Sequence, residues 1–551
     1  MPTYFLFDYF YVLTLFIVLF IFLFFFGRAF IILYSYVSRN KFSDNFTLIN
    51  TKASVFYPIF GLFFLGNCLI IFNYFLPIKS FYVYLFTFII LLINLNEKID
   101  IKIIFSNISI KFLISLILVI STFDINFHYD GGYYHIGHQF WIRESKLVVG
   151  FVNIFWAYGI GSIYEFISAF FWIGKNFYVL HLLNLIFLFI FFEFIYLHII
   201  NLKFSILKIP FLFLILFSIF DNFGYQGGRN GYLYIEGISA FDNPVAIVFF
   251  ITALVYFILL NQDNIQANEI FLVTSLTLFL IQLKLSSVVI LVYLVFLTLR
   301  LLKNGKTIIQ LLQINLLNAI FFFSWIIKNL LTSGCLIFPV SITCNFNFRW
   351  YIKGSTLDYQ NITTTYSNSY KIGENFYLWT KNYLEIPINK TVLYNLLVSI
   401  LIFLVIRVIF FKKNYNLNSK YLKYFIFINI TYYIFTGPTP RYYIGLVLII
   451  ISYLGMNLEF RYKKLFSNNF LIFLFFISVL SLPRINSYKS LYLNNIEISI
   501  PKVETEKIDD TWVTPVPGED QCWNIQFCTP EKRSQKIIIN EKIYKTVYLN
   551  N

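Results

Sequence analysis

The stretch YFYVLTLFIVLFIFLFFFGRAFIILY, residues 9–34, contains a single charged residue, Arg28. About 20 consecutive apolar residues are enough for a helix to cross the hydrocarbon core of a bilayer. The run is too long for the apolar part of a cleavable signal peptide, and no basic residue precedes it. It therefore predicts a transmembrane helix at the start of the chain.

Similar apolar runs recur to about residue 483. Hydrophobic residues make up 59% of the 551 positions and charged residues 13%, and the mean hydropathy is +0.72. Soluble globular proteins average roughly 45–50% apolar and about 25% charged residues. We predict an all-α fold, a polytopic transmembrane helical bundle with about fourteen spans.

The net charge of +15 reflects where the basic residues lie and does not indicate a nucleic-acid partner. Cytoplasmic loops of membrane proteins are enriched in Lys and Arg. When the predicted spans are threaded in order, every strongly basic turn falls on one side; these turns lie at 39–52, 98–111, 203–208, 300–306, 412–423 and 461–464. Both termini are then predicted to lie outside, in the periplasm, for a multi-pass protein of the bacterial inner (plasma) membrane.

The chain divides into three predicted parts. Residues 1–111 form N-terminal extra transmembrane helices, 112–483 a transmembrane core, and 484–551 a polar periplasmic tail. The core carries two large periplasmic loops, at 125–175 and 327–389. The first loop mixes polar and apolar residues with helical spacing, which is typical of helices that lie in the membrane interface. We expect such helices at about 131–146 and 159–173.

Four of the five cysteines fall in two close pairs within segments predicted to be external, whereas Cys68 lies alone in a span. The pairs are Cys335 with Cys344 and Cys522 with Cys528. Paired cysteines in an oxidising compartment favour disulfides. Free thiols or a four-cysteine metal site are the alternatives, but neither pair has C-x-x-C spacing.

The segment Phe127–Trp141, FHYDGGYYHIGHQFW, concentrates acid, base and aromatic groups at the outer end of a predicted span. Asp130, Tyr134 and His138 recur at four-residue intervals, so a helix would place them on one face. His135 would lie nearby. A carboxylate at this boundary can serve as a general base toward a hydroxyl group. We therefore predict Asp130 as the catalytic residue, with the three other side chains binding substrate.

Two other interpretations of this segment stay open. Asp130 can cap the helix that starts there, by accepting hydrogen bonds from backbone N–H groups. His128, Asp130, His135 and His138 also offer a nitrogen and oxygen ligand set for a metal. The H-x-x-H spacing differs from the i, i+4 pair of H-E-x-x-H helices, however. We predict no protein-held metal.

Several cations fall at outer ends of spans or within them, where charge is costly and usually functional. They are Arg143, Arg229, Lys284, Lys328 and Arg441. Lys284 interrupts the apolar run 270–300, which predicts either two spans or a broken helix. Arg441 follows Gly-Pro-Thr-Pro at the outer start of another. An anionic phosphate is a suitable partner for these groups; snorkelling to the interface is the alternative.

The segment YDGGYYHIGHQFW, followed by an amphipathic stretch, resembles the first external loop of C-type (GT-C superfamily) glycosyltransferases. Other segments resemble a group of bacterial membrane proteins related to that superfamily: Phe241-Asp242-Asn243-Pro244, Leu283-Lys-Leu-Ser-Ser, WIIKNLLTSGCLIFP at 325–339 and the Gln521-Cys-Trp tail. The resemblance extends from about residue 120 to the end. It implies a GT-C-like core and adds Asp242 to the substrate-binding set. One departure is Gly131, which replaces the second acid of the common pair, and a divalent metal is left open as a cofactor.

The resemblance implies an enzyme that transfers a sugar from a polyprenyl-phosphate-linked donor to a glycan or lipid acceptor, with inversion at the sugar carbon. Membrane lipids and these two substrates are the expected partners. Two alternatives remain. A polysaccharide polymerase or ligase would depend on external Arg and His rather than on Asp130. A flippase or transporter would place charges at mid-membrane and show an internal repeat.

Overall fold

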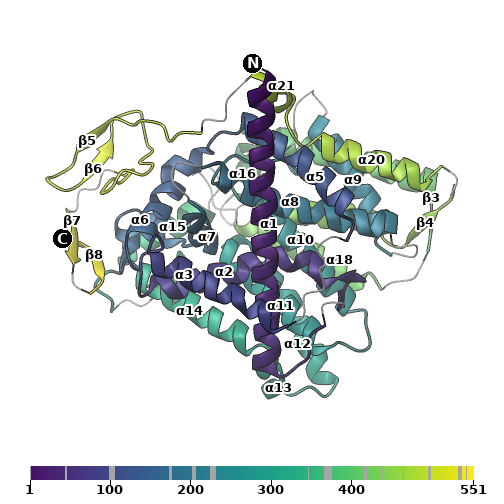
Figure 1. Cartoon of the computed structure of the whole chain (residues 1–551), viewed down its shortest axis with the longest axis horizontal. Coiled ribbons are helices and arrows are strands. Elements are labelled where there is room, and N and C mark those ends of the chain that lie inside the picture. The colour runs from purple at the N-terminus through teal and green to yellow at the C-terminus, as the bar shows by residue number, and fades with distance from the viewer. Residues whose placement is uncertain are drawn as a thin grey trace.

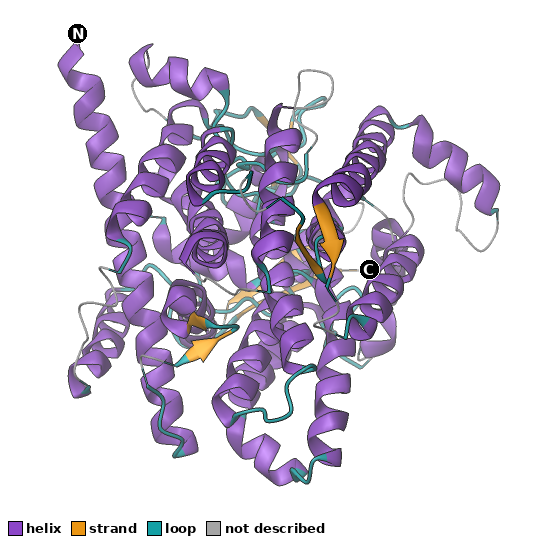
Figure 2. Cartoon of the chain, turned by 90° about the vertical axis from the view of Figure 1, so that its right-hand side faces the viewer, coloured by secondary structure: helices purple, strands orange, loops and turns teal. Residues whose placement is uncertain are grey.

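The protein is described from a computed structural model, which places residues 2–43, 46–97, 106–172, 177–201, 206–223, 231–344, 347–364, 375–414, 418–436, 439–462, 465–493, 498–531, 536–541 and 543–550. Helices fill most of the molecule, and the strands are short (Figure 2). They form antiparallel pairs: β1 (Thr47–Leu48) with β2 (Thr51–Lys52), β3 (Phe411–Lys413) with β4 (Leu458–Phe460), β5 (Thr505–Lys507) with β6 (Val513–Pro515), and β7 (Lys536–Glu541) with β8 (Lys545–Asn550).

Seven helical stretches within the described residues are long and apolar enough to cross a membrane: Phe7–Ser38, Ala53–Asn73, Tyr178–Ile200, Asp242–Leu259, Leu285–Lys303, Leu316–Ser333 and Pro387–Phe410. They comprise α1 (Pro2–Ser38), α2 (Tyr57–Asn73), α8 (Tyr178–Tyr196), α10 (Asp242–Leu259), α12 (Leu291–Lys303), α14 (Leu316–Ser333) and α17 (Pro387–Phe410), some with an adjoining short helix. A pair bent by 71°, α20 (Asn468–Leu480) and α21 (Ile485–Leu493), would make an eighth. The chain is a helical membrane protein.

The remaining apolar segments also form helices, but shorter ones. They are α3 (Phe81–Leu92), α5 (Ile108–Val119), α9 (Lys208–Phe223), α11 (Ala267–Leu283), α18 (Lys420–Thr436) and α19 (Ile444–Leu454). The long apolar runs therefore form helices, and the predicted span at about 308–326 is divided at Asn315 between α13 and α14. The number of helices that cross the membrane stays a prediction. The predicted interruption at Lys284 is present: α11 ends at Leu283, Lys284 is extended, and the short helix η8 (Leu285–Ile290) leads into α12.

The two helices predicted in the first large loop are also present. A π-helical turn, η4 (Gly131–His135), continues into α6 (Ile136–Glu144), and α7 (Ile163–Phe171) follows. Short helices η5 (Phe151–Asn153) and η6 (Trp156–Gly159) lie between them. The other connecting helices are α13 (Ile308–Ile314), α15 (Lys353–Thr364) and α16 (Phe376–Glu385), together with η1 (Ala53–Phe56), η2 (Ile93–Asn96), η3 (Ile120–Asp124), η7 (Leu197–Asn201), η9 (Ser341–Thr343) and η11 (Pro440–Tyr442).

The bundle has a buried centre and a more exposed margin. In the most apolar part of α10, 89% of the residues are buried inside the protein, whereas in that of α17 only 28% are buried. α10 packs against α8, α11 and α19. The long helix α1 runs down one face of the molecule (Figure 1) and packs most extensively against α2.

Segments predicted to be external lie together. α21 packs against η3 and against α1, and Figure 1 shows it beside the N-terminus. The C-terminal hairpin reaches the first loop, where the Val547 N–H donates to the Val149 carbonyl at 2.8 Å. The start of α1, η3, the first loop and the tail are therefore linked to one another by contacts. Their placement on one outer side of a membrane stays a prediction.

Loops predicted to be cytoplasmic contact one another in the same way. The Asn268 side chain donates to the Lys41 carbonyl at 3.2 Å, Thr51 Oγ1 lies 2.9 Å from His198 Nε2, and Arg300 donates to the Leu260 carbonyl. The sorting of loops into two sides is thus internally consistent. Which side faces which compartment stays a prediction.

The contact between α1 and α2 depends on two glycines and provides a test of the fold. A Cβ atom on Gly61 would lie 2.0 Å from the Leu23 carbonyl oxygen, and one on Gly27 would lie 1.9 Å from that of Tyr57. Small residues allow membrane helices to approach this closely. We expect Gly61→Ala to separate the helices and to destabilise the protein by about 1–3 kcal/mol, as overpacking does.

The measurement is the apparent melting temperature of the purified protein in detergent. Gly354→Ala is the control, because a Cβ there meets no atom within 4 Å. An unchanged melting temperature for Gly61→Ala would contradict the observed helix packing.

Candidate functional site

Asp130 is positioned by a short pairing between two loops. The His128 N–H donates to the Ile238 carbonyl, and the Ile238 N–H donates to the Asn126 carbonyl, both at 3.0 Å. This parallel bridge fixes residues 126–128 beside the segment that leads into α10. Asp242 is the first residue of α10, so the bridge brings Asp130 and Asp242 to the same place.

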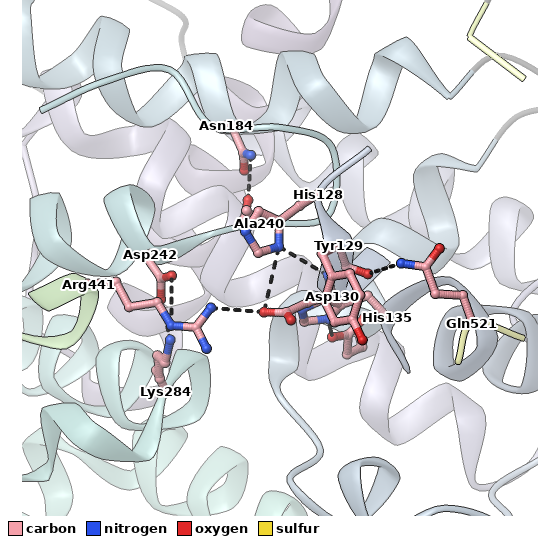
Figure 3. A network of polar contacts seen from close by, with 11 residues as sticks. His128, Tyr129, Asp130, His135, Asn184, Ala240, Asp242, Lys284, Arg441 and Gln521 are labelled. Carbon is pink, nitrogen blue, oxygen red and sulfur yellow. Dashed lines mark hydrogen bonds and ion pairs between the residues drawn. The ribbon is translucent and has the colours of Figure 1, made fainter. Parts of the chain in front are cut away.

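Two carboxylates and two cations alternate at this point (Figure 3). Arg441 Nη1 lies 3.0 Å from Asp130 Oδ2, and Arg441 Nε lies 3.9 Å from Asp242 Oδ2. Asp242 also pairs with Lys284. The Asp130 and Asp242 side chains are 17% and 10% exposed, so these pairs are less screened by water than surface ion pairs. The four groups form one nearly neutral network.

A cavity of about 90 Å³ opens over this network. Its lining includes seven of the ten residues predicted for the site, namely Asp130, Tyr134, His135, His138, Asp242, Lys284 and Arg441. The structure thus gathers side chains from the first loop, from the start of α10, from the break after α11 and from η11. The predicted helical face of Asp130, Tyr134 and His138 does point to one cavity.

Asp130 is the N-cap of η4, but its side chain makes no capping hydrogen bond to this helix. The carboxylate binds Arg441 instead. The capping alternative is therefore not observed, and the carboxylate lies at the cavity, held by an ion pair.

The strongest partner of His135 is Glu165, which we did not predict. Glu165 Oε1 pairs with His135 Nδ1, and Oε2 accepts a hydrogen bond from Gln139 Nε2 at 2.9 Å. Burial opposes ionisation of Glu165, but the charge and hydrogen bond of His135 outweigh it and hold the pKa of the Glu165 carboxyl below its usual value. This carboxylate orients the imidazole ring of His135 at the cavity. Its only sequence signal was an acid within the amphipathic stretch that became α7.

Tyr442 was also missed. Lys284 Nζ lies 4.2 Å from the centroid of its ring, and the Arg441 guanidinium carbon lies 5.3 Å from it. Cations within about 6 Å of an aromatic ring are attracted by its negative face. Tyr442 therefore helps to hold both cations at the cavity.

Glu236 lies behind the network and is fully buried. Burial, followed by the charge of Asp242, raises the pKa of the Glu236 carboxyl well above its ordinary value. Its Oε1 accepts the N–H of Asn243 at 3.1 Å. Burial and the Asp242 carboxylate therefore both disfavour the ionised form of Glu236, whereas Asp242 pairs with Lys284.

Three predicted cations lie elsewhere. Arg143 donates to the Ala169 carbonyl at 2.7 Å and stacks on Trp172, so it links α6 to α7. Lys328 is buried beneath the cavity and donates to the Gly161 carbonyl at 2.6 Å. Arg229 falls outside the described residues.

The donor groups do not fit a divalent metal. Asp130 and Asp242 already pair with cations, and His135 pairs with Glu165. Among the described residues, no three His, Cys, Asp or Glu side chains are arranged to hold a metal ion. We derive no chemical step through a metal.

Both predicted disulfides are present, Cys335–Cys344 and Cys522–Cys528. Cys68 is a buried free thiol within α2.

Comparison with protein families adds one finding. A family described as "Domain of unknown function (DUF8201)" matches residues 10–448. The chain belongs to this family. The DUF8201 match includes α1 to α3, Asp130 and Arg441, and it ends before the tail. No curated protein and no solved structure matches the chain.

His138 gives this member of the DUF8201 family a predicted acid sensitivity. Its ring lies between Phe151 and Tyr158, at centroid distances of 5.1 and 5.3 Å. Burial lowers the pKa of His138 from 6.5 to about 3, against the opposing charge of Glu165. Below pH 6.5 the unfolded chain gains a proton that the folded protein does not. The contribution of His138 to the free energy of unfolding is therefore fully present above pH 6.5 and decreases as the pH falls toward 3. At pH 5 the decrease is about 2 kcal/mol.

We expect the apparent melting temperature of the wild type to fall between pH 7 and pH 5, and we expect His138→Gln to remove part of this fall. His128→Gln is the comparison, because the His128 ring is 38% exposed and its protonation costs less. Identical pH dependence in the wild type and in His138→Gln would refute the assignment.

Proposed function

We propose that this protein is an integral-membrane glycosyltransferase of the C type. It transfers a sugar from a polyprenyl-phosphate-linked donor to a glycan or lipid acceptor on the periplasmic side of the bacterial inner membrane. In this proposal the chain crosses the membrane about fourteen times and both termini are periplasmic. The observation that carries the proposal is the convergence of Asp130 with Arg441 and Lys284 on one cavity at the edge of the helical bundle.

Asp130 is the proposed general base. The acceptor hydroxyl oxygen attacks the anomeric carbon of the sugar while its proton passes to the Asp130 carboxylate. The bond from that carbon to the phosphate oxygen breaks, and the polyprenyl phosphate leaves with the electron pair. This single displacement inverts the configuration at the anomeric carbon. His135, oriented by Glu165, is placed to hold the acceptor.

Arg441 and Lys284 are the proposed phosphate ligands. In the absence of substrate, both already pair with carboxylates, Arg441 with Asp130 and Lys284 with Asp242. A carboxylate bound to Arg is a weaker base, because the nearby positive charge favours its ionised form. A donor phosphate that takes over the Arg441 guanidinium would therefore release Asp130 for proton abstraction. In this mechanism, donor binding activates the base.

The first test is Asp130→Asn, which keeps the shape of the side chain and removes its basicity. We expect transfer to fall by about 10²–10⁴-fold, the usual contribution of a general base. The measurement follows lipid-linked sugars and finished glycans by mass spectrometry in a strain that lacks the wild-type gene. Asp358→Asn, an exposed residue of α15, is the matched control. Wild-type amounts of finished glycan with Asp130→Asn, at wild-type protein levels, would contradict this mechanism.

The second test is Arg441→Met. Charge-assisted hydrogen bonds contribute about 1.5–3 kcal/mol, so we expect the dissociation constant for a short-chain polyprenyl phosphate to rise by about tenfold or more. Binding can be measured by calorimetry in detergent. Arg461→Met is the control, since Arg461 bonds the Phe411 carbonyl in a predicted cytoplasmic turn. Equal phosphate affinity in Arg441→Met and the wild type would remove Arg441 from the donor site.

A further inference from the structure

The C-terminal tail inserts a tryptophan against the segment that carries Asp130. Trp523 is 4% exposed, and its ring packs edge to face on Phe127 at a centroid distance of 5.0 Å. Its backbone N–H donates to the Gly132 carbonyl at 3.0 Å. The tryptophan belongs to a loop closed by the Cys522–Cys528 disulfide, and that loop lies outside the residues matched by the family.

Two glycines of the segment make room for this loop. A Cβ on Gly132 would lie 2.4 Å from an indole carbon of Trp523, and a Cβ on Gly137 would lie 3.1 Å from the Trp523 carbonyl oxygen. Real Cβ atoms do not approach a ring as closely as 2.4 Å. The absence of a side chain at Gly132 is therefore a requirement of the contact with the tail.

The tail holds the chain on both sides of Asp130. Gln521 Nε2 donates to the Tyr129 carbonyl at 3.0 Å, as Figure 3 shows, and the Tyr129 hydroxyl bonds the Asp520 carboxylate. Trp523 holds Gly132. The tail thus bonds the chain just before Asp130, through two contacts at Tyr129, and two residues after it, at Gly132.

Local structure alone would leave this segment poorly restrained. η4 is a π-helical turn, an uncommon form that often occurs at functional sites, and it opens on two consecutive glycines, which have the most backbone freedom to lose. The Asp130 side chain does not cap it. Restraint has to come from tertiary contacts, and the tail supplies several of them.

The loop that carries Trp523 is itself firmly attached. The Val513 N–H donates to the Phe527 carbonyl at 3.0 Å, and Thr529 Oγ1 donates to the Ile154 carbonyl at 2.9 Å. Trp523 and Phe527 have φ angles of +50° and +57°, a left-handed conformation that is unfavourable for residues with a side chain. A bulky residue keeps such a conformation only where its surroundings hold it, and here the disulfide and the packing on η4 do so.

We propose that the disulfide-closed loop is part of the site and that Trp523 is a positioning residue. Its contacts hold the backbone around Asp130 so that the carboxylate stays within ion-pair distance of Arg441. This role rests on the proposed function only in so far as Asp130 is the reactive group. The contact itself can be tested without any activity measurement.

The structural test is hydrogen–deuterium exchange of the full-length protein in lipid nanodiscs. With Trp523→Ala we expect exchange in residues 128–141 to quicken by about tenfold or more, while exchange in α8 is unchanged. Trp523→Phe retains an aromatic ring and the backbone hydrogen bond, so it should restore most of the protection. Ile543→Ala, at an exposed position of the tail hairpin, is the surface control. Unchanged exchange in 128–141 with Trp523→Ala overturns the proposal.

The two disulfides provide a matched comparison. The pair Cys522→Ser and Cys528→Ser should quicken exchange in 128–141. The pair Cys335→Ser and Cys344→Ser, which lies in the hydrophobic cluster around Phe338, should not. Should Trp523→Ala unfold the bundle, seen as faster exchange in α8, this comparison decides the question. Equal effects of the two pairs overturn the proposal.

The kinetic test separates positioning from general stability. We expect Trp523→Ala to lower kcat by about 100-fold, the loss that a displacement of about 1 Å can cause, with little change in KM for the donor and with recovery in Trp523→Phe. Faster exchange without loss of kcat overturns the positioning role. If the wild type transfers no sugar, the proposed function fails, and exchange alone then decides whether the tail fixes this segment.

Discussion

The guanidinium of Arg441 lies between two carboxylates that are far apart in the sequence, and the site depends on this interaction. Asp130 comes from the first large loop and Asp242 from the start of α10, whereas Arg441 precedes α19. Charges at the edge of a membrane bundle are costly unless they are paired. Pairing therefore fixes how closely the loop, α10 and η11 can approach one another. The cavity is the space left between them.

This network is nearly neutral, and in the proposed mechanism its cations change partners when the donor phosphate binds. Lys284 and Arg441 share the ring of Tyr442 and the Asp242 carboxylate, so neither cation is left without a neighbour while the partners change. His135 stands apart from this network because its Nδ1 pairs with Glu165. One group of residues is thus suited to receive a phosphate, and a second to keep an imidazole fixed beside it.

The predicted external side of the protein is assembled from segments that are far apart in the chain. The first loop pairs with residue 238 through its backbone, accepts Trp523 against its glycines, and exchanges backbone hydrogen bonds with the C-terminal hairpin. The tail has few long apolar runs of its own, and a disulfide compensates for a small core. The tail, although it lies beyond the family match, therefore forms part of the surroundings of Asp130.

Much of the fold followed from the sequence alone. Burial of apolar side chains is set by composition and spacing, so the long hydrophobic runs within the described residues became helices, and the run 270–300 broke at Lys284. The cysteine pairs were an equally local property. Asp130, Lys284 and Arg441 were found because a charge in an apolar surrounding is conspicuous wherever it occurs.

Only the tertiary structure decided which of those charges meet. Arg143 and Lys328 were predicted for the site on the same grounds as Arg441. In the structure, however, each donates a hydrogen bond to a backbone carbonyl away from the ion-pair network. Glu165 and Tyr442 gave no distinctive signal, since an acid in an amphipathic helix and an aromatic residue in an aromatic-rich chain are ordinary. Trp523 lies in the Gln521-Cys-Trp segment, but nothing in that segment indicated contact with the residues around Asp130. The sequence determines that a charge needs a partner near the membrane. Which partner it finds depends on distances between helices, and these are fixed by packing across the whole bundle.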